Sequence, residues 1–352
     1  MAQGVASAPA LHQDHPSAGG PSETKPQLRR EAHRHTYGAI DLGTNNCRLL
    51  IARPNEKGFT VIDAFSRIVR LGEGLSLSGE LAQDAMDRAV GALGVCADKL
   101  RRRNVSLSRS VATEACRRAK NGREFADRVR DETGIVLDII PPQEEARLAV
   151  LGCHKLLEPG DGPALIFDIG GGSTELVLID HIDGTPKIRS WWSAPWGVVS
   201  LTESEGKEAL EGPERLLAYK RMRERARRAF ANFAAILPEH GDDIRLLGTS
   251  GTVTTLASVH LALPSYDRRA VDGLHVPIDA MRSISDMIAG MDYEERSALP
   301  CIGTERADLV VAGCAILEAI IEIWPAQKLG VADRGIREGI LRSLMARDGW
   351  QL

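Results

Sequence analysis

Two segments far apart in the chain share one pattern of apolar and polar positions. The first, YGAIDLGTNNCRLLIARP from Tyr37, and the second, ALIFDIGGGSTELVLI from Ala164, both run from apolar through polar and glycine-containing to apolar again. Short apolar runs separated by Gly, Asn, Asp and Thr predict two strands joined by a tight turn. Since the same unit occurs twice, with Asp41 matching Asp168, the pattern indicates an internal repeat.

Between and after these units, strand patterns alternate with helix patterns. Apolar side chains recur at helical spacing from Met86 to Leu100. Pro141 and Pro142 close the strand IVLDII and begin a helix near Gln143. Further strands are predicted in FTVIDAFSRIVRL, VSLSRSVA and QKLGVAD and at residues 244–247, and further helices at residues 213–237 and at the C-terminal end. This alternation predicts an α/β fold with mixed sheets.

The repeat also predicts two related domains. The 352 residues suffice for about two domains of ordinary size, and Gly43 matches Gly170 in the same alignment. We therefore expect domain I at residues 37–160 and domain II at residues 161–352, with the boundary near Glu158–Pro163.

Composition places the chain among ordinary soluble globular proteins. Residues 1–36 are rich in Pro, Ser, Gly, Gln and His without an apolar segment, which predicts a disordered tail and not a signal peptide. No apolar run approaches the about 18 residues of a membrane span. Six scattered cysteines without a Cys-x-x-Cys pair argue against a zinc site or disulfides and for a reducing cytoplasm. At a net charge of −4, an anionic ligand must be bound by local Arg, Lys and backbone N–H groups, and we expect no nucleic-acid partner.

Three glycine-rich turns follow predicted strands, at residues 41–46, 168–174 and 248–252. Glycine lets backbone N–H groups approach a phosphate, and successive N–H groups form an anion-binding nest. The alternative for any one of them is a plain turn. None fits the Walker or dinucleotide-binding pattern, which excludes those two classes. The turn residues expected to contact phosphate are Gly43, Thr44, Asn45, Gly170, Gly171, Gly172, Ser173, Gly248, Ser250, Gly251 and Thr252.

Acidic residues accompany the first two turns. Asp41 and Asp168 stand where strands enter the turns, and Glu175 follows the second turn. A carboxylate that faces phosphates is unfavourable unless a divalent cation or a water network intervenes, so we expect Mg²⁺ at Asp41, Asp168 and Glu175. The alternative for a single Asp is local turn chemistry, since Asp favours Asx-turns.

Glu144 and Glu145 lie in the first turn of the helix that follows Pro142. One interpretation is a favourable interaction with the helix dipole. The other is that one of the two takes a proton from an attacking water. The pattern alone leaves this choice open.

Basic residues near the turns are candidate phosphate ligands because Arg can bind phosphate bidentately. Arg48 lies just past the first turn, and Arg117 opens a helix beside Thr113. The basic run at residues 220–228 instead predicts a solvated face of a long helix, with guidance of a long anion as the alternative.

Several of these segments together resemble the exopolyphosphatase/guanosine pentaphosphate phosphohydrolase (Ppx/GppA) phosphatase family. The resemblance runs from about Tyr37 to the C-terminus and rests on motifs in the family's order: AIDLGTNNCRLLI, RLGEGL, VATEACRRAKN, IIPPQEEARLAVLG, FDIGGGSTELV, LLGTSGTVTTLA, ERADLVVAG and GVADRGIREGIL. It implies two related domains of the actin/sugar-kinase/Hsp70 superfamily that enclose phosphates, in the short two-domain type. Relatives commonly carry Ser where Thr44 and Asn46 stand here.

The resemblance also implies roles for individual residues. The second glutamate of the EEAR motif, Glu145, would be the catalytic base. The DIGGGSTE segment would be the phosphate and Mg²⁺ site, with Asp168 and Glu175 as metal ligands. Arg117, from the T-x-x-x-R motif, and Arg48 would bind phosphate.

The resemblance implies an exopolyphosphatase that releases terminal orthophosphate by Mg²⁺-assisted, in-line attack of water activated by Glu145. The alternatives are a guanosine pentaphosphate (pppGpp) 5′-phosphohydrolase, a sugar or carboxylate kinase of the same superfamily, and a non-catalytic sensor that binds (p)ppGpp. A homodimer is left open as a further association.

Overall fold

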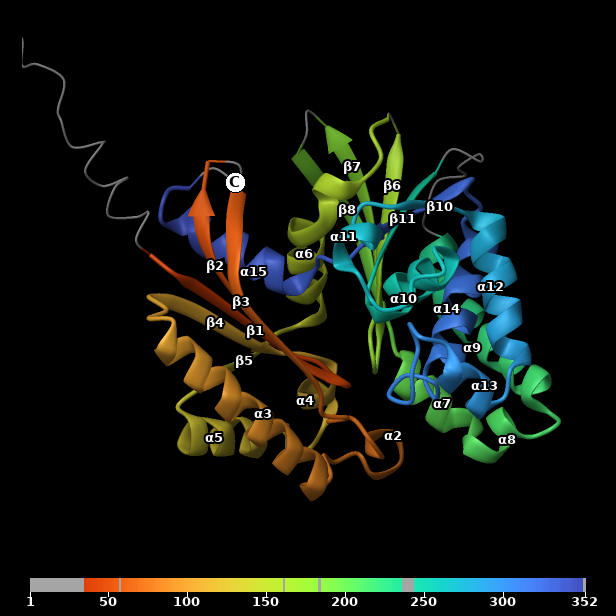
Figure 1. Cartoon of the computed structure of the whole chain (residues 1–352), viewed down its shortest axis with the longest axis horizontal. Helices are drawn as coiled ribbons and strands as arrows, with labels where there is room; N and C mark the ends of the chain where they lie inside the picture. The colour runs from red at the N-terminus through yellow and green to blue at the C-terminus, as the bar shows by residue number, and fades with distance from the viewer. Residues whose placement is uncertain (1–34, 57, 161, 183–184, 236–243, 351–352) are drawn as a thin grey trace, which may run out of the picture.

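The computed structural model describes residues 35–56, 58–160, 162–182, 185–235 and 244–350. These residues form two α/β units that lie side by side (Figure 1). Each unit is built on one mixed β-sheet, and helices cover both sheets.

The first sheet has five strands in the order β3-β2-β1-β4-β5. Strand β1 pairs antiparallel with β2 and parallel with β4, so the predicted hairpin lies in the middle of the sheet. The five strands are β1 (Tyr37–Leu42), β2 (Asn46–Asn55), β3 (Gly58–Ile68), β4 (Leu107–Ala112) and β5 (Leu137–Ile139).

The second sheet repeats this plan. Its order is β10-β11-β9-β6-β7-β8, in which β6, β7 and β8 form the antiparallel meander and β9 and β11 continue it in parallel. The repeat inferred from the hydrophobic pattern is therefore a repeat of topology, with β10 added at one edge. The strands are β6 (Pro163–Ile169), β7 (Thr174–Ile182), β8 (Thr185–Ala194), β9 (Arg245–Thr249), β10 (His275–Pro277) and β11 (Lys328–Ala332).

Helices cover the outer faces of both sheets. In the first unit these are α2 (Leu75–Ser78), α3 (Gln83–Arg102), α4 (Glu114–Arg118) and α5 (Gly122–Thr133). In the second they are α7 (Val198–Glu205), α8 (Lys207–Glu211), α9 (Arg215–Ala235), α10 (Gly251–His260), α11 (Arg268–Val271), α12 (Ile278–Gly290), α13 (Tyr293–Ala298) and α14 (Val310–Ile323). Almost all of α14 is buried, so it forms the centre of the second core.

Two helices lie between the sheets and join the units. They are α6 (Pro142–Cys153), followed by the short 3₁₀ turn His154–Leu156, and α15 (Ile336–Arg347). Helix α15 comes from the end of the chain but packs against β1 and β2 of the first sheet, where Figure 1 shows it in blue beside the orange strands. The predicted division at residues 160 and 161 thus separates the two sheets in sequence, whereas α15 returns to the first sheet in space.

Close backbone contact holds α6 and α15 together. A Cβ atom added at Gly152 would lie 2.0 Å from the carbonyl oxygen of Gly335, and one added at Gly339 would lie 2.0 Å from that of Leu148. Only glycine permits this approach, because a real Cβ atom would overlap the facing backbone.

The start of the folded part differs from the prediction. Most of the tail predicted at residues 1–36 lies outside the described residues, but Thr36 is already buried. Its carbonyl oxygen accepts a hydrogen bond from the Ser106 amide at 2.8 Å, which extends the pairing of β1 with β4 beyond the start of both strands. The predicted tail was therefore too long at this end.

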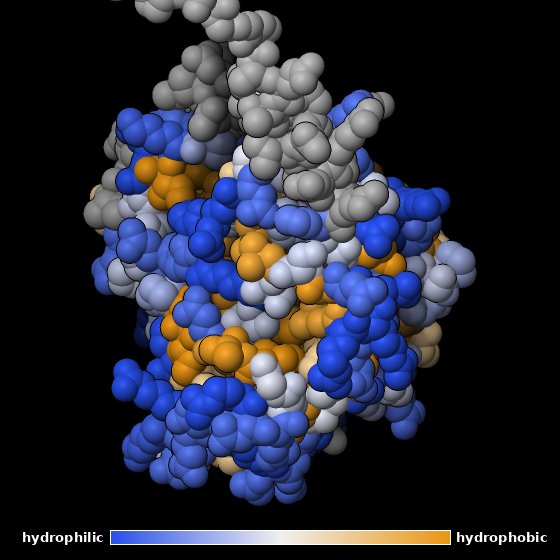
Figure 2. Space-filling view, turned by 90° about the vertical axis from the view of Figure 1, so that its left-hand side faces the viewer, coloured by the Kyte–Doolittle hydropathy of each residue, from blue (hydrophilic) through white to orange (hydrophobic). Residues whose placement is uncertain are grey.

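On the face shown in Figure 2, hydrophilic residues surround several apolar patches. The basic run on α9 is also largely neutralised within the chain. Arg221 and Arg225 both pair with Glu205, and Arg227 and Arg228 pair with Glu224. This pairing leaves less free positive charge on α9 than a freely solvated face would carry.

No helix among the described residues combines the length and apolar character needed to span a bilayer.

Candidate functional site at the junction of two hairpin turns

The alternation of side chains along the strands directs four charged residues toward the gap between the sheets. In β1 and β2, alternate residues that include Ala39 and Leu50 pack against α15. Asp41 and Arg48 continue this row, and they stand directly opposite each other in the hairpin. The second hairpin is arranged in the same way, and there Asp168 stands opposite Glu175 on the face that packs against α6.

The two hairpin turns meet across the gap. A Cβ atom added at Gly171 would lie 2.8 Å from the Cβ of Thr44 and 3.2 Å from the amide nitrogen of Asn45. The turns also close in the same way, since the amide of Gly43 donates to Asn46 and that of Gly170 donates to Ser173, both at 2.9 Å. The predicted convergence of these two turns is thus observed.

The carbonyl oxygens of the first turn accept hydrogen bonds from backbone amides of the segment after β3. The amide of Gly72 donates to the Thr44 carbonyl oxygen, and those of Val69 and Arg70 donate to the Asn45 carbonyl oxygen. No hydrogen bond among the described residues engages the amides of Thr44 and Asn45. These amides are therefore available to an anion in the gap.

The second turn is held in an equivalent way. The amides of Val198 and Val199, at the start of α7, donate to the carbonyl oxygens of Gly170 and Gly171 at 2.9 and 2.8 Å. Within the described ranges, the amides of Gly171 and Gly172 donate to no other group. Both turns thus present N–H groups to the same space.

The third predicted turn is the junction between β9 and α10. Ser250 has a φ of +127°, a conformation that L side chains rarely adopt, and it lies at the N-terminus of α10. Ser250, Gly251 and Thr252 line a cavity that residues of both hairpin turns also line. Gly248 does not, because it lies within β9, where an added Cβ would be 2.7 Å from the ring of Phe167. Its role is close packing.

Burial raises the pKa of the three carboxyl groups expected to bind metal. Desolvation is the main cause for Asp41, Asp168 and Glu175, and it raises the pKa of Asp168 to about 8. Arg48 opposes the effect at Asp41, whereas the Glu175 carboxylate adds to it at Asp168. Both aspartates lie within strands, so the Asx-turn alternative does not describe them.

The structure separates the adjacent glutamates of α6. Glu144 accepts hydrogen bonds from Arg109 and Arg147, each at 2.7 Å, and these partners lower its pKa to about 2. Glu145 is buried and lines the cavity. Burial raises the pKa of Glu145 well above its usual range, and the nearby Glu175 carboxylate adds to this. Of these two glutamates, Glu145 is therefore the one that combines access to the cavity with a raised pKa.

Arg117 was expected to bind phosphate, but it is not among the residues that line the cavity. Its Nη1 donates to the carbonyl oxygen of Ile140 at 2.7 Å and to Oε2 of Glu145 at 3.1 Å. Here Arg117 orients Glu145, whose Oε1 takes part in no hydrogen bond of the described residues.

The cavity wall contains further charged residues that the sequence analysis did not single out. They are Glu114, Arg306, Asp333, Arg334 and Arg337. For Asp333, Arg334 and Arg337 the sequence contains one usable signal. They directly follow β11, which is parallel to β9, and parallel neighbouring strands end at the same edge of a sheet, so these residues lie near the turn after β9.

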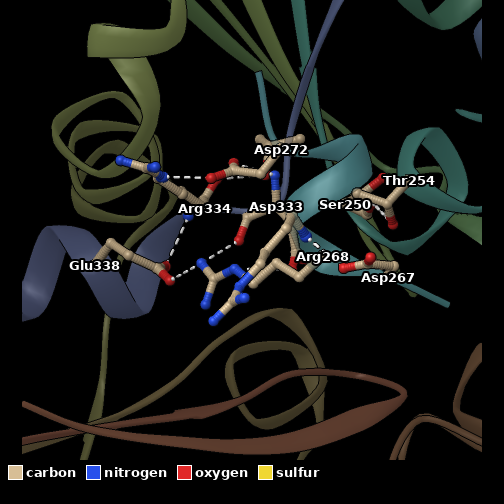
Figure 3. A network of polar contacts seen from close by, with 11 residues as sticks. Ser250, Thr254, Asp267, Arg268, Asp272, Asp333, Arg334 and Glu338 are labelled. Carbon is tan, nitrogen blue, oxygen red and sulfur yellow. Dashed lines mark hydrogen bonds and ion pairs between the residues drawn. The ribbon is translucent and has the colours of Figure 1, made fainter. Parts of the chain in front are cut away.

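A polar network holds the segment after β11 (Figure 3). Arg268 pairs with Asp333 at 3.1 Å and with Glu338 at 2.9 Å, and Arg334 pairs with Asp272 at 2.7 Å. By contrast, Arg48 and Arg337 line the cavity without an ion-pair partner among the described residues. Two guanidinium groups without an ion-pair partner thus line the same cavity as the turns, and guanidinium groups are suited to bind phosphate bidentately.

The carboxylates also suit a hard cation. Mg²⁺ prefers oxygen ligands and is usually held by one or two carboxylates together with water and substrate phosphates. In the described ranges, no three His, Cys, Asp or Glu side chains stand close enough to hold a metal by themselves. Asp41, Asp168 and Glu175 therefore do not form a complete metal site, and at most one or two of them would bind a Mg²⁺ ion directly, together with water and substrate oxygens.

Comparison with known proteins finds a family, curated relatives and solved structures that agree with one another. The model of the Ppx/GppA phosphatase family matches residues 50–348. Exopolyphosphatase 2 of Mycobacterium tuberculosis is 31% identical over 322 residues, which cover 87% of this chain and 97% of that protein. A putative exopolyphosphatase of Haemophilus influenzae is 28% identical, covering 87% of this chain and 90% of that protein. The crystal structure of the Aquifex aeolicus member of the Ppx/GppA family superposes with a TM-score of 0.72 at 32% identity, covering 90% of this chain and 99% of that one.

Proposed function

Since the chain belongs to the Ppx/GppA phosphatase family and is a phosphoanhydride hydrolase of actin-like fold, we propose that it releases terminal orthophosphate from inorganic polyphosphate. One observation carries the proposal. Two amide-bearing turns and two unpaired arginines surround the same gap as Glu145, a buried carboxylate of raised basicity.

The terminal phosphate would be bound where the turns meet. The amides of Thr44, Asn45, Gly171 and Gly172 supply donors that need no rearrangement, and the N-terminus of α10 adds a partial positive charge. Phosphates further along the chain would reach guanidinium groups of the wall, among them Arg48, Arg306, Arg334 and Arg337.

Glu145 would act as the general base. Its Oε1 accepts a proton from water as the water oxygen attacks the terminal phosphorus. The bond between that phosphorus and the bridging oxygen breaks, and the shortened polyphosphate leaves with the negative charge. Arg117 keeps the base aimed at the gap through Oε2. Because water itself attacks the phosphorus, the proposed step forms no covalent intermediate.

We include Mg²⁺ in the proposal, with Asp168, Glu175 and Asp41 as its candidate ligands, of which one or two would bind it directly. When bound, it would offset negative charge on the phosphate oxygens. Ser173 and Ser193 already donate to Oε1 of Glu175 at 2.6 and 2.9 Å, which orients Oε2 for this purpose. Burial is the main cause that raises the pKa of Asp168, and the same cation would relieve the smaller contribution from the Glu175 and Asp41 carboxylates.

The composition of the wall supports polyphosphate over guanosine pentaphosphate. No aromatic side chain occurs among the described residues that line the cavity. A guanine base would therefore lack a ring on which to stack, an interaction worth about 1–3 kcal/mol.

The test compares phosphate release from polyphosphates of several lengths with release from guanosine pentaphosphate, in the presence of Mg²⁺. We expect faster release from polyphosphate, and faster release from guanosine pentaphosphate would reverse the assignment. Phosphate release that requires a sugar or carboxylate acceptor would indicate a kinase. Tight binding of guanosine tetraphosphate without hydrolysis of either substrate would indicate a sensor.

A further inference from the structure

Glu114 is a cavity carboxylate that the proposed mechanism does not use. It opens α4 directly after β4, lines the cavity, and keeps only 12% of its side-chain surface exposed. A Cβ atom added at Gly172 would lie 2.1 Å from Oε2 of Glu114 and 3.0 Å from Oγ1 of Thr44. The carboxylate thus reaches from the first unit to the junction of both phosphate turns.

Its present contacts are weak. Thr44 Oγ1 lies 3.5 Å from Oε2, and Arg118 Nη1 lies 3.6 Å from Oε1. Both distances exceed the usual range of hydrogen bonds to a carboxylate. Such a carboxylate can leave its position at little cost, unlike Glu144, whose three contacts with Arg109 and Arg147 are all 3.0 Å or shorter.

The position of Glu114 coincides with the place that an anion would take. Glycine at position 172 leaves room for one oxygen-bearing group above the turn, and Oε2 of Glu114 fills that room. A phosphate and a carboxylate cannot share it, because two like charges at contact distance repel strongly in a site shielded from water.

We propose that Glu114 is a specificity-determining residue that occupies the phosphate position of the Gly172 turn at rest and is displaced by the terminal phosphate of the substrate. The inference rests on the proposed function, since it concerns the same site. Its consequence is weak binding of free orthophosphate. A lone phosphate has few contacts with which to displace Glu114, whereas a polyphosphate is also held by the arginines of the wall.

The test measures the Kd of inorganic phosphate by calorimetry, without Mg²⁺, for the wild type and for Glu114→Gln. Removing the competing charge should tighten phosphate binding about tenfold and should increase inhibition of polyphosphate hydrolysis by orthophosphate. Glu114→Asp, which keeps the charge but shortens its reach, should fall between them. Glu124→Gln removes the same charge from an exposed position on α5 and should leave the Kd unchanged.

Two outcomes would overturn the inference. Phosphate affinity that is unchanged or weaker in both folded Glu114 variants would show that the carboxylate does not compete. A higher Mg²⁺ concentration for half-maximal turnover, with unchanged phosphate affinity, would identify Glu114 as a cation ligand. Phosphate binding needs no hydrolysis, so a wild type that fails to cleave polyphosphate would end the proposed function while the Kd values still decide the role of Glu114.

Discussion

The hairpins β1–β2 and β6–β7 share strand order, register and turn hydrogen bonds, yet at one of two equivalent charged positions they carry opposite charges. Asp41 faces Arg48 in the first hairpin, whereas Asp168 faces Glu175 in the second. The first pair is balanced, and Arg48 lowers the pKa of Asp41 against the effect of burial. In the second pair burial, and after it the Glu175 carboxylate, raise the pKa of Asp168 to about 8.

This difference shows how one duplicated unit can serve two purposes. In the proposed function, the first hairpin would supply a cation for phosphate, and the second would supply carboxylates for Mg²⁺. Glu145 belongs to neither hairpin. It comes from α6, which lies between the sheets, so the base is positioned independently of the two binding elements.

The largest expected effect is on kcat, when the proposed base Glu145 is removed. This change tests the chemical step separately from substrate binding. Glu145→Gln should lower kcat on polyphosphate about 10²–10⁴-fold, because water must then lose its proton without assistance. Substrate affinity, measured by calorimetry, should stay close to that of the wild type. Glu144→Gln is the matched control and should keep near-normal turnover, since Glu144 is engaged by Arg109 and Arg147. Equal losses in both variants would contradict the assignment of Glu145.

A smaller effect should distinguish the two hairpins directly. Arg48→Gln should raise KM for polyphosphate about ten- to hundredfold, since a hydrogen bond to a charged group contributes about 1.5–3 kcal/mol. Glu175→Gln should instead raise the Mg²⁺ concentration that gives half-maximal activity. Steady-state kinetics over a Mg²⁺ titration measure both quantities. If the two variants changed the same quantity, the division of labour between the hairpins would be wrong.

The smallest effect concerns stability and pH. Between the ordinary carboxyl pKa, about 4, and about 8, folded Asp168 keeps a proton that the unfolded chain has lost. The folded state then binds more protons, so the free energy of unfolding contributed by this group falls as pH rises. In chelator, the Tm of Asp168→Asn relative to the wild type should therefore be higher at pH 8 than at pH 5, with about 2–4 °C for each kcal/mol.

The control for that measurement is Asp127→Asn, a substitution on the exposed side of α5. It should leave the pH dependence of the Tm unchanged. A Tm difference between Asp168→Asn and the wild type that did not grow with pH would show that Asp168 does not hold its proton in the folded state.

Much of this arrangement could be predicted from sequence. Local rules located the hairpins, because strands and tight turns depend on neighbouring residues, and the repeat gave the equivalence of Asp41 and Asp168. The residue pattern left the choice between Glu144 and Glu145 open, and only the family resemblance favoured Glu145. The physical difference is tertiary, since Glu145 is buried at the cavity whereas Glu144 pairs with Arg109 from β4 and with Arg147. Gly248 could not be separated from the other turn glycines, because its constraint is the ring of Phe167 on another strand.

The sequence by itself determined the two α/β units, the turns that offer backbone amides, and the types of charged residue beside them, since each follows from local periodicity and backbone preference. The tertiary structure alone decided that α15 returns to the first sheet, that Arg117 orients Glu145, and that Glu114 reaches the Gly172 turn. These outcomes depend on how helices pack across the gap. Packing brings together residues that are distant in the chain, and local sequence patterns do not predict such contacts.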